Sequence, residues 1–162
     1  MRVLFVCTGN ICRSPTAEGV LRKIVSDAGM NQQIIVDSAG THGSHQGHPP
    51  DSRAQSAAKS RGYDLSKLKA RKLVADDFEH FDLLLAMDEG HFSIMQRIAP
   101  PGTRDKVKMF LSYARNTGGP TALEVPDPYY GAPGGFDRVL DLIEDAANGL
   151  FASIQRDPTF PT

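Results

Sequence analysis

The sequence predicts an α/β fold of three layers, with a central four-stranded parallel sheet flanked by helices. Short apolar runs alternate along the chain with segments whose apolar residues recur at helical spacing. Two of these runs, residues 2–6 and 82–87, are almost continuously apolar, as expected of strands that are covered on both faces. Strands that alternate with helices are typical of a parallel sheet with helical layers on both sides.

The chain has 162 residues, which predicts a single domain over residues 1–162. Its formal net charge of −1 gives no electrostatic reason to expect nucleic-acid binding. No segment approaches the roughly 20 apolar residues of a membrane span, and no signal-peptide core is evident, so we expect a cytoplasmic protein. The two cysteines do not resemble the disulfide framework of a secreted domain.

The first half of the chain predicts two strands and two helices. After the strand at residues 2–6, Ser14 is a good N-cap and Pro15 suits the first helical position, and this helix should stop near Gly29. Residues 33–37 form the second predicted strand. The second helix is expected over residues 51–61, and Gly62 marks its end.

The second half predicts a third strand at 82–87, with Asp88 as the cap of the helix that follows. A weaker fourth strand is expected at 106–109. The clearest helix is the last, whose apolar stripe comprises Phe136, Val139, Leu140, Ile143, Ala147, Leu150 and Ile154. The Gly- and Pro-rich segment 116–135 should be a long loop, and loops of that length are usually functional or disordered.

The segment Cys7-Thr8-Gly9-Asn10-Ile11-Cys12-Arg13-Ser14 follows the first predicted strand, where ligands bind in such folds. Backbone N–H groups that curl ahead of a helix start form an anion-binding nest, and Gly9 and Asn10 tolerate the left-handed conformations that this curl needs. Arg13 has a planar fork that suits phosphate. The segment therefore predicts a phosphate-binding loop.

Cys7 stands at the start of this loop, where the positive field should favour its thiolate form. A thiolate that faces bound phosphate is a phosphoryl-transfer nucleophile, and Ser14 could donate a hydrogen bond to it. The alternative is a buried cysteine at a strand end beside a surface arginine. The joint pattern of Cys, five residues, Arg and Ser between a strand and a helix start favours the nucleophile.

Residues 125–130, Val-Pro-Asp-Pro-Tyr-Tyr, contain a second candidate. Two prolines should hold Asp127 in an extended, stiff loop, from which its carboxyl group could protonate a leaving oxygen. An aspartate before a proline is also common in simple turns. Tyr129 and Tyr130 could form the wall of a pocket and stack on a substrate ring, or they could be half-buried loop aromatics.

The chain resembles the low-molecular-weight protein tyrosine phosphatases, as a bacterial-type member. The resemblance rests on residues 6–15, on Asp37-Ser38, on Met87-Asp88 and on Asp127-Pro-Tyr-Tyr130. It implies hydrolysis of phosphotyrosine through a phosphocysteine intermediate, without a cofactor or metal. It implies Cys7 as nucleophile, Arg13 as phosphate binder and Asp127 as general acid, and it favours a wall role for at least one tyrosine.

The resemblance also implies that Asn10, Ser14 and Ser38 form a hydrogen-bonded network that holds the loop in shape. Eukaryotic members carry a histidine in this network where the present chain has Leu68. Leucine cannot form a side-chain hydrogen bond, so the network must be smaller or completed by other groups. Cys12 could be a buried packing residue, and the resemblance favours a redox partner that protects Cys7 as a disulfide.

Three histidines, His42, His45 and His48, lie close together in the sequence. Such a tract can bind metal, but the surrounding Gly and Pro residues favour a flexible loop without fixed ligand geometry. In the family this loop borders the pocket entrance.

Two other functions compete with the phosphatase. An arsenate reductase on the same fold passes a disulfide through additional cysteines, and this chain has only Cys12 besides Cys7. A non-catalytic phosphoprotein-binding module would not need the catalytic residue types, all of which are present. We therefore expect a tyrosine-phosphorylated protein as substrate, one candidate being an autophosphorylating tyrosine kinase, as in bacterial members of the family.

Overall fold

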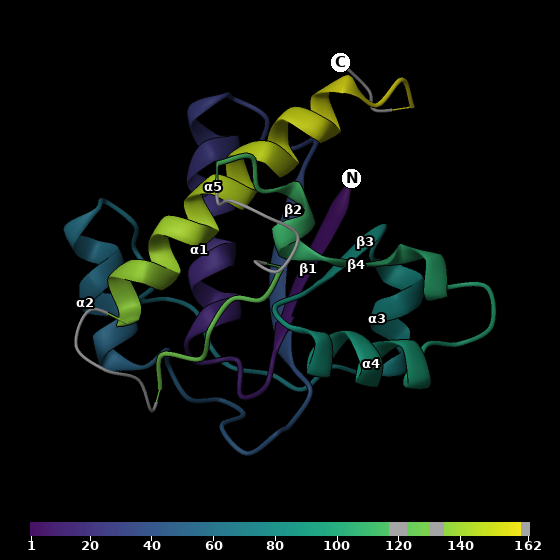
Figure 1. The fold of residues 1–162 in the computed structure, drawn as a ribbon, viewed down its shortest axis with the longest axis horizontal. Helices are drawn as coiled ribbons and strands as arrows, with labels where there is room; N and C mark the ends of the chain where they lie inside the picture. Colours follow the sequence, from purple (N-terminus) through teal and green to yellow (C-terminus); the bar gives the residue numbers. More distant parts are fainter. Residues whose placement is uncertain (117–122, 130–134, 160–162) are drawn as a thin grey trace.

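The computed structural model describes residues 1–116, 123–129 and 135–159. Four strands form one parallel sheet in the order β2-β1-β3-β4 (Figure 1). The strands are β1 (Arg2–Cys7), β2 (Ile35–Gly40), β3 (Leu83–Ala86) and β4 (Val107–Met109). The predicted three-layer α/β class is therefore confirmed.

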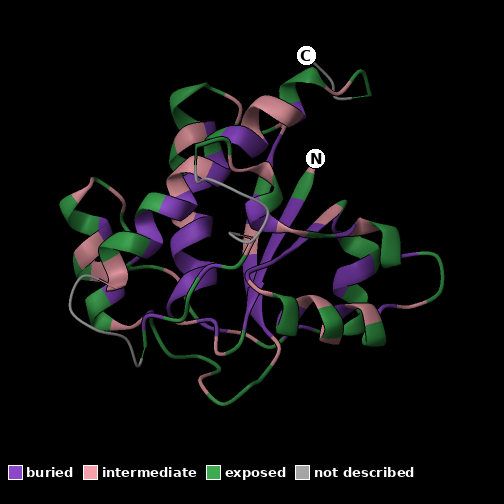
Figure 2. Cartoon of the chain, viewed as in Figure 1, coloured by how far each residue is buried: buried purple, intermediate pink, exposed green. Residues whose placement is uncertain are grey.

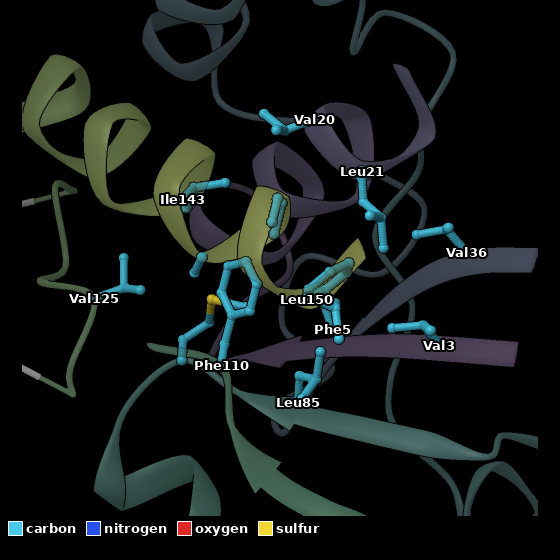
Figure 3. Close-up of a cluster of buried hydrophobic side chains, with 14 of the residues drawn as sticks. Val3, Phe5, Val20, Leu21, Val36, Leu85, Phe110, Val125, Ile143 and Leu150 are labelled. Carbon is cyan, nitrogen blue, oxygen red and sulfur yellow. The ribbon is translucent and has the colours of Figure 1, made fainter. Parts of the chain in front are cut away.

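Side chains alternate across β1 and supply two separate cores. Val3, Phe5 and Cys7 pack with α1 (Arg13–Asp27) and α5 (Gly135–Arg156) on one face of the sheet. Figure 3 shows this core, in which the rings of Phe5 and Phe110 meet edge to face at 4.9 Å. Leu4 and Val6 pack on the opposite face, against residues of α3 (Ala75–His80) and α4 (Glu89–Ile98). The sheet is consequently the most buried layer (Figure 2).

The remaining elements are α2 (Ser52–Ser60) and two short 3₁₀ helices, η1 (Arg104–Lys106) and η2 (Phe110–Tyr113). Asp51 caps α2 and Asp88 caps α4, each by accepting a backbone N–H. The prediction that Asp88 caps the following helix is confirmed. Among the described residues, no helix combines the length and the apolar character needed to cross a membrane.

Three details of the prediction were wrong. The first helix starts at Arg13, and Ser14 lies inside it instead of capping it, because the Ser14 hydroxyl is engaged by Cys7 and Asn10. The second strand begins two residues later than predicted and continues to Gly40, because its register follows β1 as far as Cys7. The short helix α3 was not predicted, since its six residues are too few to show a helical period.

Candidate active site

The loop after β1 lies at the carboxyl edge of the sheet, between the ends of β2 and β3. Its backbone is tied to the chain after β2, since Thr41 N donates to Cys7 O and His42 N donates to Thr8 O. Asn10 has a φ of 58°, the one positive value at a non-glycine residue in the described part of the chain. Gly40 is required here, because a Cβ would approach Thr8 O to 2.6 Å. The curled conformation expected at Asn10 is thus present.

A hydrogen-bonded network extends from the Cys7 sulfur into the interior. Cys7 Sγ lies 2.9 Å from Ser14 Oγ, which accepts a hydrogen bond from Asn10 Nδ2 at 2.8 Å. The same amide donates to Ser38 Oγ at 2.9 Å, and Ser38 Oγ donates to Glu18 Oε1 at 2.6 Å. All five side chains are almost completely buried, so these contacts are shielded from water.

Position 68 is leucine, so no histidine joins this network. Glu18 and the backbone N–H of Arg71 complete it instead. The Glu18 carboxylate pairs with Arg22 at 2.6 Å, and burial raises the pKa of Glu18 against the opposing influence of Ser38 and Arg22. Asn10 Oδ1 accepts the backbone N–H of Arg71 at 3.0 Å. Glu18 was not predicted as part of the site, because its hydrogen-bond partner Ser38 lies on a different element.

Arg13 is buried at the other side of the loop. Its Nη1 donates to Asp88 Oδ2 at 2.9 Å and to the carbonyl oxygen of Val125 at 3.0 Å, and its Nη2 lies 3.7 Å from Asp127 Oδ2. The backbone N–H of Val125 in turn donates to Met87 O at the end of β3. These contacts bring the 123–129 segment over the loop that follows β1.

Asp127 and Tyr129 stand at the exposed mouth of the site. The side chain of Asp127 is 44% exposed and accepts the backbone N–H of Tyr129 at 3.0 Å. Arg53, which pairs with Asp51, donates to Tyr129 O at 3.3 Å and lies over the Tyr129 ring at 5.3 Å. Arg53 was not predicted as part of the site. Tyr130, the other predicted wall residue, lies outside the described residues.

These groups surround a cavity of about 210 Å³. It is lined by Cys7, Thr8, Gly9, Ile11, Cys12, Arg13, Ser44, His45, Asp127 and Tyr129. Asn10, Ser14 and Ser38 support the loop from behind instead of lining the cavity. The structure therefore brings the predicted nucleophile, arginine and acid to one opening.

Only one of the three clustered histidines lines this cavity. His45 packs close to Gly9, where a Cβ would approach its ring to 2.9 Å, while His45 and His48 face each other with ring centroids 5.9 Å apart. Within the described ranges, no three His, Cys, Asp or Glu side chains gather closely enough to hold a metal ion. The geometry gives His45 a place in the pocket wall.

The two cysteines lie at opposite ends of the loop. Both are free and buried, Cys7 at the end of β1 and Cys12 just before α1. Burial, together with the nearby Asp51 carboxylate, raises the pKa of Cys12 to about 12. Cys12 therefore remains a thiol at neutral pH, while the Cys7 sulfur is in hydrogen-bond contact with the Ser14 hydroxyl.

A cysteine that contacts a serine hydroxyl, an anion-binding loop at a helix start and a facing carboxyl group define the class of cysteine-dependent phosphomonoester hydrolases. The model of the family "Low molecular weight phosphotyrosine protein phosphatase" matches residues 2–159. The chain belongs to this family.

Named relatives agree with this assignment. A low molecular weight protein-tyrosine-phosphatase of Streptomyces coelicolor is 44% identical over 95% of this chain and 93% of its own length. The crystal structure of a protein tyrosine phosphatase from Entamoeba histolytica superposes with a TM-score of 0.90 at 39% identity, covering 96% of this chain and 97% of its own. A drosophila arginine phosphatase also superposes, with a TM-score of 0.88 at 31% identity, covering 97% and 99%. The arsenate reductase alternative is not favoured.

Proposed function

We propose that the enzyme, a protein-tyrosine phosphatase, acts as one domain over residues 1–162 in which Cys7, Arg13 and Asp127 carry the reaction. The observation that supports these roles is their convergence on one cavity, with the Cys7 sulfur held at its base by Ser14. No cofactor or metal enters the proposed reaction. The substrate is a tyrosine-phosphorylated protein.

In the first half of the reaction, the backbone N–H groups of the 7–14 loop and the guanidinium of Arg13 bind the phosphoryl oxygens. The Cys7 thiolate attacks phosphorus, so that an S–P bond forms while the bond from phosphorus to the phenolic oxygen breaks. Asp127 gives its proton to the departing oxygen, because phenolate, with a pKa near ~10, leaves poorly at neutral pH. Tyrosine is released and a phosphocysteine remains.

In the second half, water attacks the phosphorus of the phosphocysteine. The Asp127 carboxylate accepts a proton from this water, the S–P bond breaks, and inorganic phosphate leaves. The electron pair of that bond returns to Cys7, whose thiolate receives a hydrogen bond from Ser14. The network through Asn10, Ser38 and Glu18 keeps the Ser14 hydroxyl oriented for this purpose.

The pocket wall supports an aromatic phosphate as substrate. Tyr129, and in our proposal Tyr130, would flank the substrate ring, with Ile11 on the loop side. A tyrosine kinase that phosphorylates itself is one candidate substrate. We propose a cytoplasmic location, because a thiolate nucleophile must remain reduced to act and reducing compartments preserve it.

Substrate selectivity provides the direct test of this function. The purified enzyme should hydrolyse a phosphotyrosine peptide far faster than matched phosphoserine or phosphoarginine peptides, as measured by phosphate release without added metal. Phosphoarginine is included because one solved structure of the same fold is named an arginine phosphatase. Preference for phosphoarginine would reject tyrosine as the principal target, and absence of any turnover would reject the catalytic function.

Loss of the Asp127 carboxyl group should lower kcat/KM most for substrates with poor leaving groups. We expect Asp127→Asn to give a steep dependence of kcat/KM on leaving-group pKa across a series of aryl phosphates, where the wild type is nearly flat. The variant should also lose the limb of the pH profile that reports a protonated acid. An equal loss of kcat/KM for every leaving group would make Asp127 a structural residue of its loop.

Mild peroxide should inactivate the enzyme reversibly. The Cys7 thiolate attacks one peroxide oxygen to give a sulfenic acid, and the Cys12 thiol then displaces water from it to form a disulfide. We expect a mass loss of two hydrogens and full recovery with excess thiol. Cys12→Ser should instead progress to an irreversibly oxidised Cys7. Wild-type protein that shows only sulfinic or sulfonic acid would contradict this protective role.

A further inference from the structure

His91 is a buried residue near the site that the reaction described above does not use. It lies in the first turn of α4, is 3% exposed, and contacts two elements at once. Its Nε2 lies 2.7 Å from Thr8 Oγ1 on the loop after β1. Its Nδ1 lies 3.1 Å from Asp88 Oδ1, a charge contact without hydrogen-bond geometry, and this buried nitrogen has no hydrogen-bond partner among the described residues.

These two contacts indicate which nitrogen carries the proton. A proton on Nδ1 is attracted by the Asp88 carboxylate 3.1 Å away and leaves Nε2 to accept the Thr8 hydroxyl hydrogen. The other tautomer would set the Nδ1 lone pair against a carboxylate oxygen in a buried place, which is unfavourable. The Nδ1–H therefore faces the Asp88 carboxylate in a charge contact, and Nε2 accepts the hydrogen bond from Thr8.

The ring stays neutral in this setting. Burial lowers the pKa of His91 to about 4, with Asp88 and Asp127 acting in the opposite direction and with Arg13 and His42 as nearby cations or potential cations. Burial by itself would raise the pKa of Asp88, but hydrogen bonds from the His91 backbone N–H and from Arg13 lower it overall. At neutral pH a neutral imidazole thus faces an ionised carboxylate.

The Asp88 carboxylate is held from two sides. Its Oδ1 receives the backbone N–H of His91 at 3.0 Å and faces the His91 ring, while its Oδ2 receives Arg13 Nη1 at 2.9 Å. Fixing Oδ1 determines where Oδ2 lies. Oδ2, together with the carbonyl oxygen of Val125, holds Arg13 Nη1 and so orients the guanidinium at the cavity.

We propose that His91 is a positioning residue that sets the orientation of Arg13 through the Asp88 carboxylate, and that joins α4 to the phosphate loop through Thr8. This inference rests on the proposed function, in which Arg13 binds the phosphoryl group. His91 does not line the cavity and does not touch substrate. Its effect should therefore appear as weaker phosphate binding and slower turnover, without a change in leaving-group dependence.

Two substitutions test the contributions of the two His91 ring nitrogens separately. In His91→Asn the side-chain amide can reproduce the Nδ1 donor towards Asp88, whereas in His91→Gln it can reproduce only the polar atom near Thr8. We expect His91→Gln to lower kcat/KM about tenfold, the scale of one lost polar contact with a charged group. We expect His91→Asn to stay within about threefold of the wild type.

Two further measurements exclude a merely structural role. Inorganic phosphate should raise the melting temperature of the wild type and of His91→Asn more than that of His91→Gln, and this readout needs no turnover. In an Asp88→Asn background, His91→Gln should have less than about twofold further effect, because residues that act through one another are not additive. A phosphate response that His91→Gln leaves unchanged would overturn the proposal.

Other outcomes would distinguish failure of the positioning role from failure of the proposed function. Full additivity of the two substitutions, or a larger loss in His91→Asn than in His91→Gln, would show that His91 does not act through Asp88. A wild type without turnover would reject the proposed function, while a phosphate response that depends on His91 would still support the positioning role.

Discussion

Replacement of Cys7 by serine is expected to abolish phosphatase turnover. Serine nearly matches the shape of cysteine and keeps the contact with Ser14, so the loop should still bind phosphate. Its hydroxyl group does not ionise near neutral pH, however, and an unionised oxygen is a poor nucleophile towards phosphorus. The loss in kcat should be on the order of 10⁶-fold, the scale found when a nucleophile is removed from a catalytic unit.

The measurement is release of p-nitrophenol from p-nitrophenyl phosphate, with phosphate-induced thermal stabilisation as the control for a folded loop. An acid-quenched wild-type reaction should carry one phosphoryl group on Cys7, and the Cys7→Ser variant should carry none. The wild type should keep its activity in EDTA. Substantial activity in Cys7→Ser, or loss of wild-type activity in EDTA, would refute the mechanism.

Arg13→Lys is expected to produce the second-largest loss although it conserves the charge. Nη1 of Arg13 donates to Asp88 and to the carbonyl oxygen of Val125. The other guanidinium N–H groups are then available to bind phosphate in the cavity, which Arg13 lines. A lysine has a single ammonium group and cannot hold these protein acceptors while it also binds phosphate in a bidentate manner. We expect kcat/KM to fall by about 10²–10³, as when one donor to a transition-state charge is removed.

A matched control is Arg97→Lys, at an exposed position in the last turn of α4. This variant should retain wild-type kcat/KM and melting temperature, whereas Arg13→Lys should lose activity even at temperatures where it is folded. An Arg13→Lys enzyme within a few-fold of wild type would remove Arg13 from the proposed chemistry.

The parts of the site that could be predicted are those encoded by neighbouring residues. The loop Cys7–Ser14 is one continuous segment between a strand and a helix, so its composition and its context could be interpreted together. The strand at 82–87 was equally clear, because a strand that is covered on both faces has apolar residues on both. The end of β2 was less clear, since Asp37 and Ser38 interrupt its apolar pattern.

The parts that could not be predicted depend on long-range contacts. Arg13 and Asp88 are 75 residues apart, and nothing local at either position indicates the other. The same holds for Arg53, which contacts Tyr129 from 76 residues away. In the sequence, Glu18 is only a charged residue in a predicted helix. The hydrogen bond that its carboxylate accepts from Ser38 depends on the packing of that helix against β2. Leu68 indicated that the network must be completed without a histidine. The structure shows that Glu18 and the backbone N–H of Arg71 contact it instead.

The central place of β1 in the sheet has a consequence for how the protein acquires activity during folding. The strand that ends at Cys7 pairs with β2, more than thirty residues later, and with β3, about eighty residues later. Non-local pairings of this kind form late and make folding slow. A growing or partly folded chain that lacks β3 would also lack Asp88, and with it the support of Arg13. Recovery of phosphatase activity on refolding should therefore coincide with completion of the sheet.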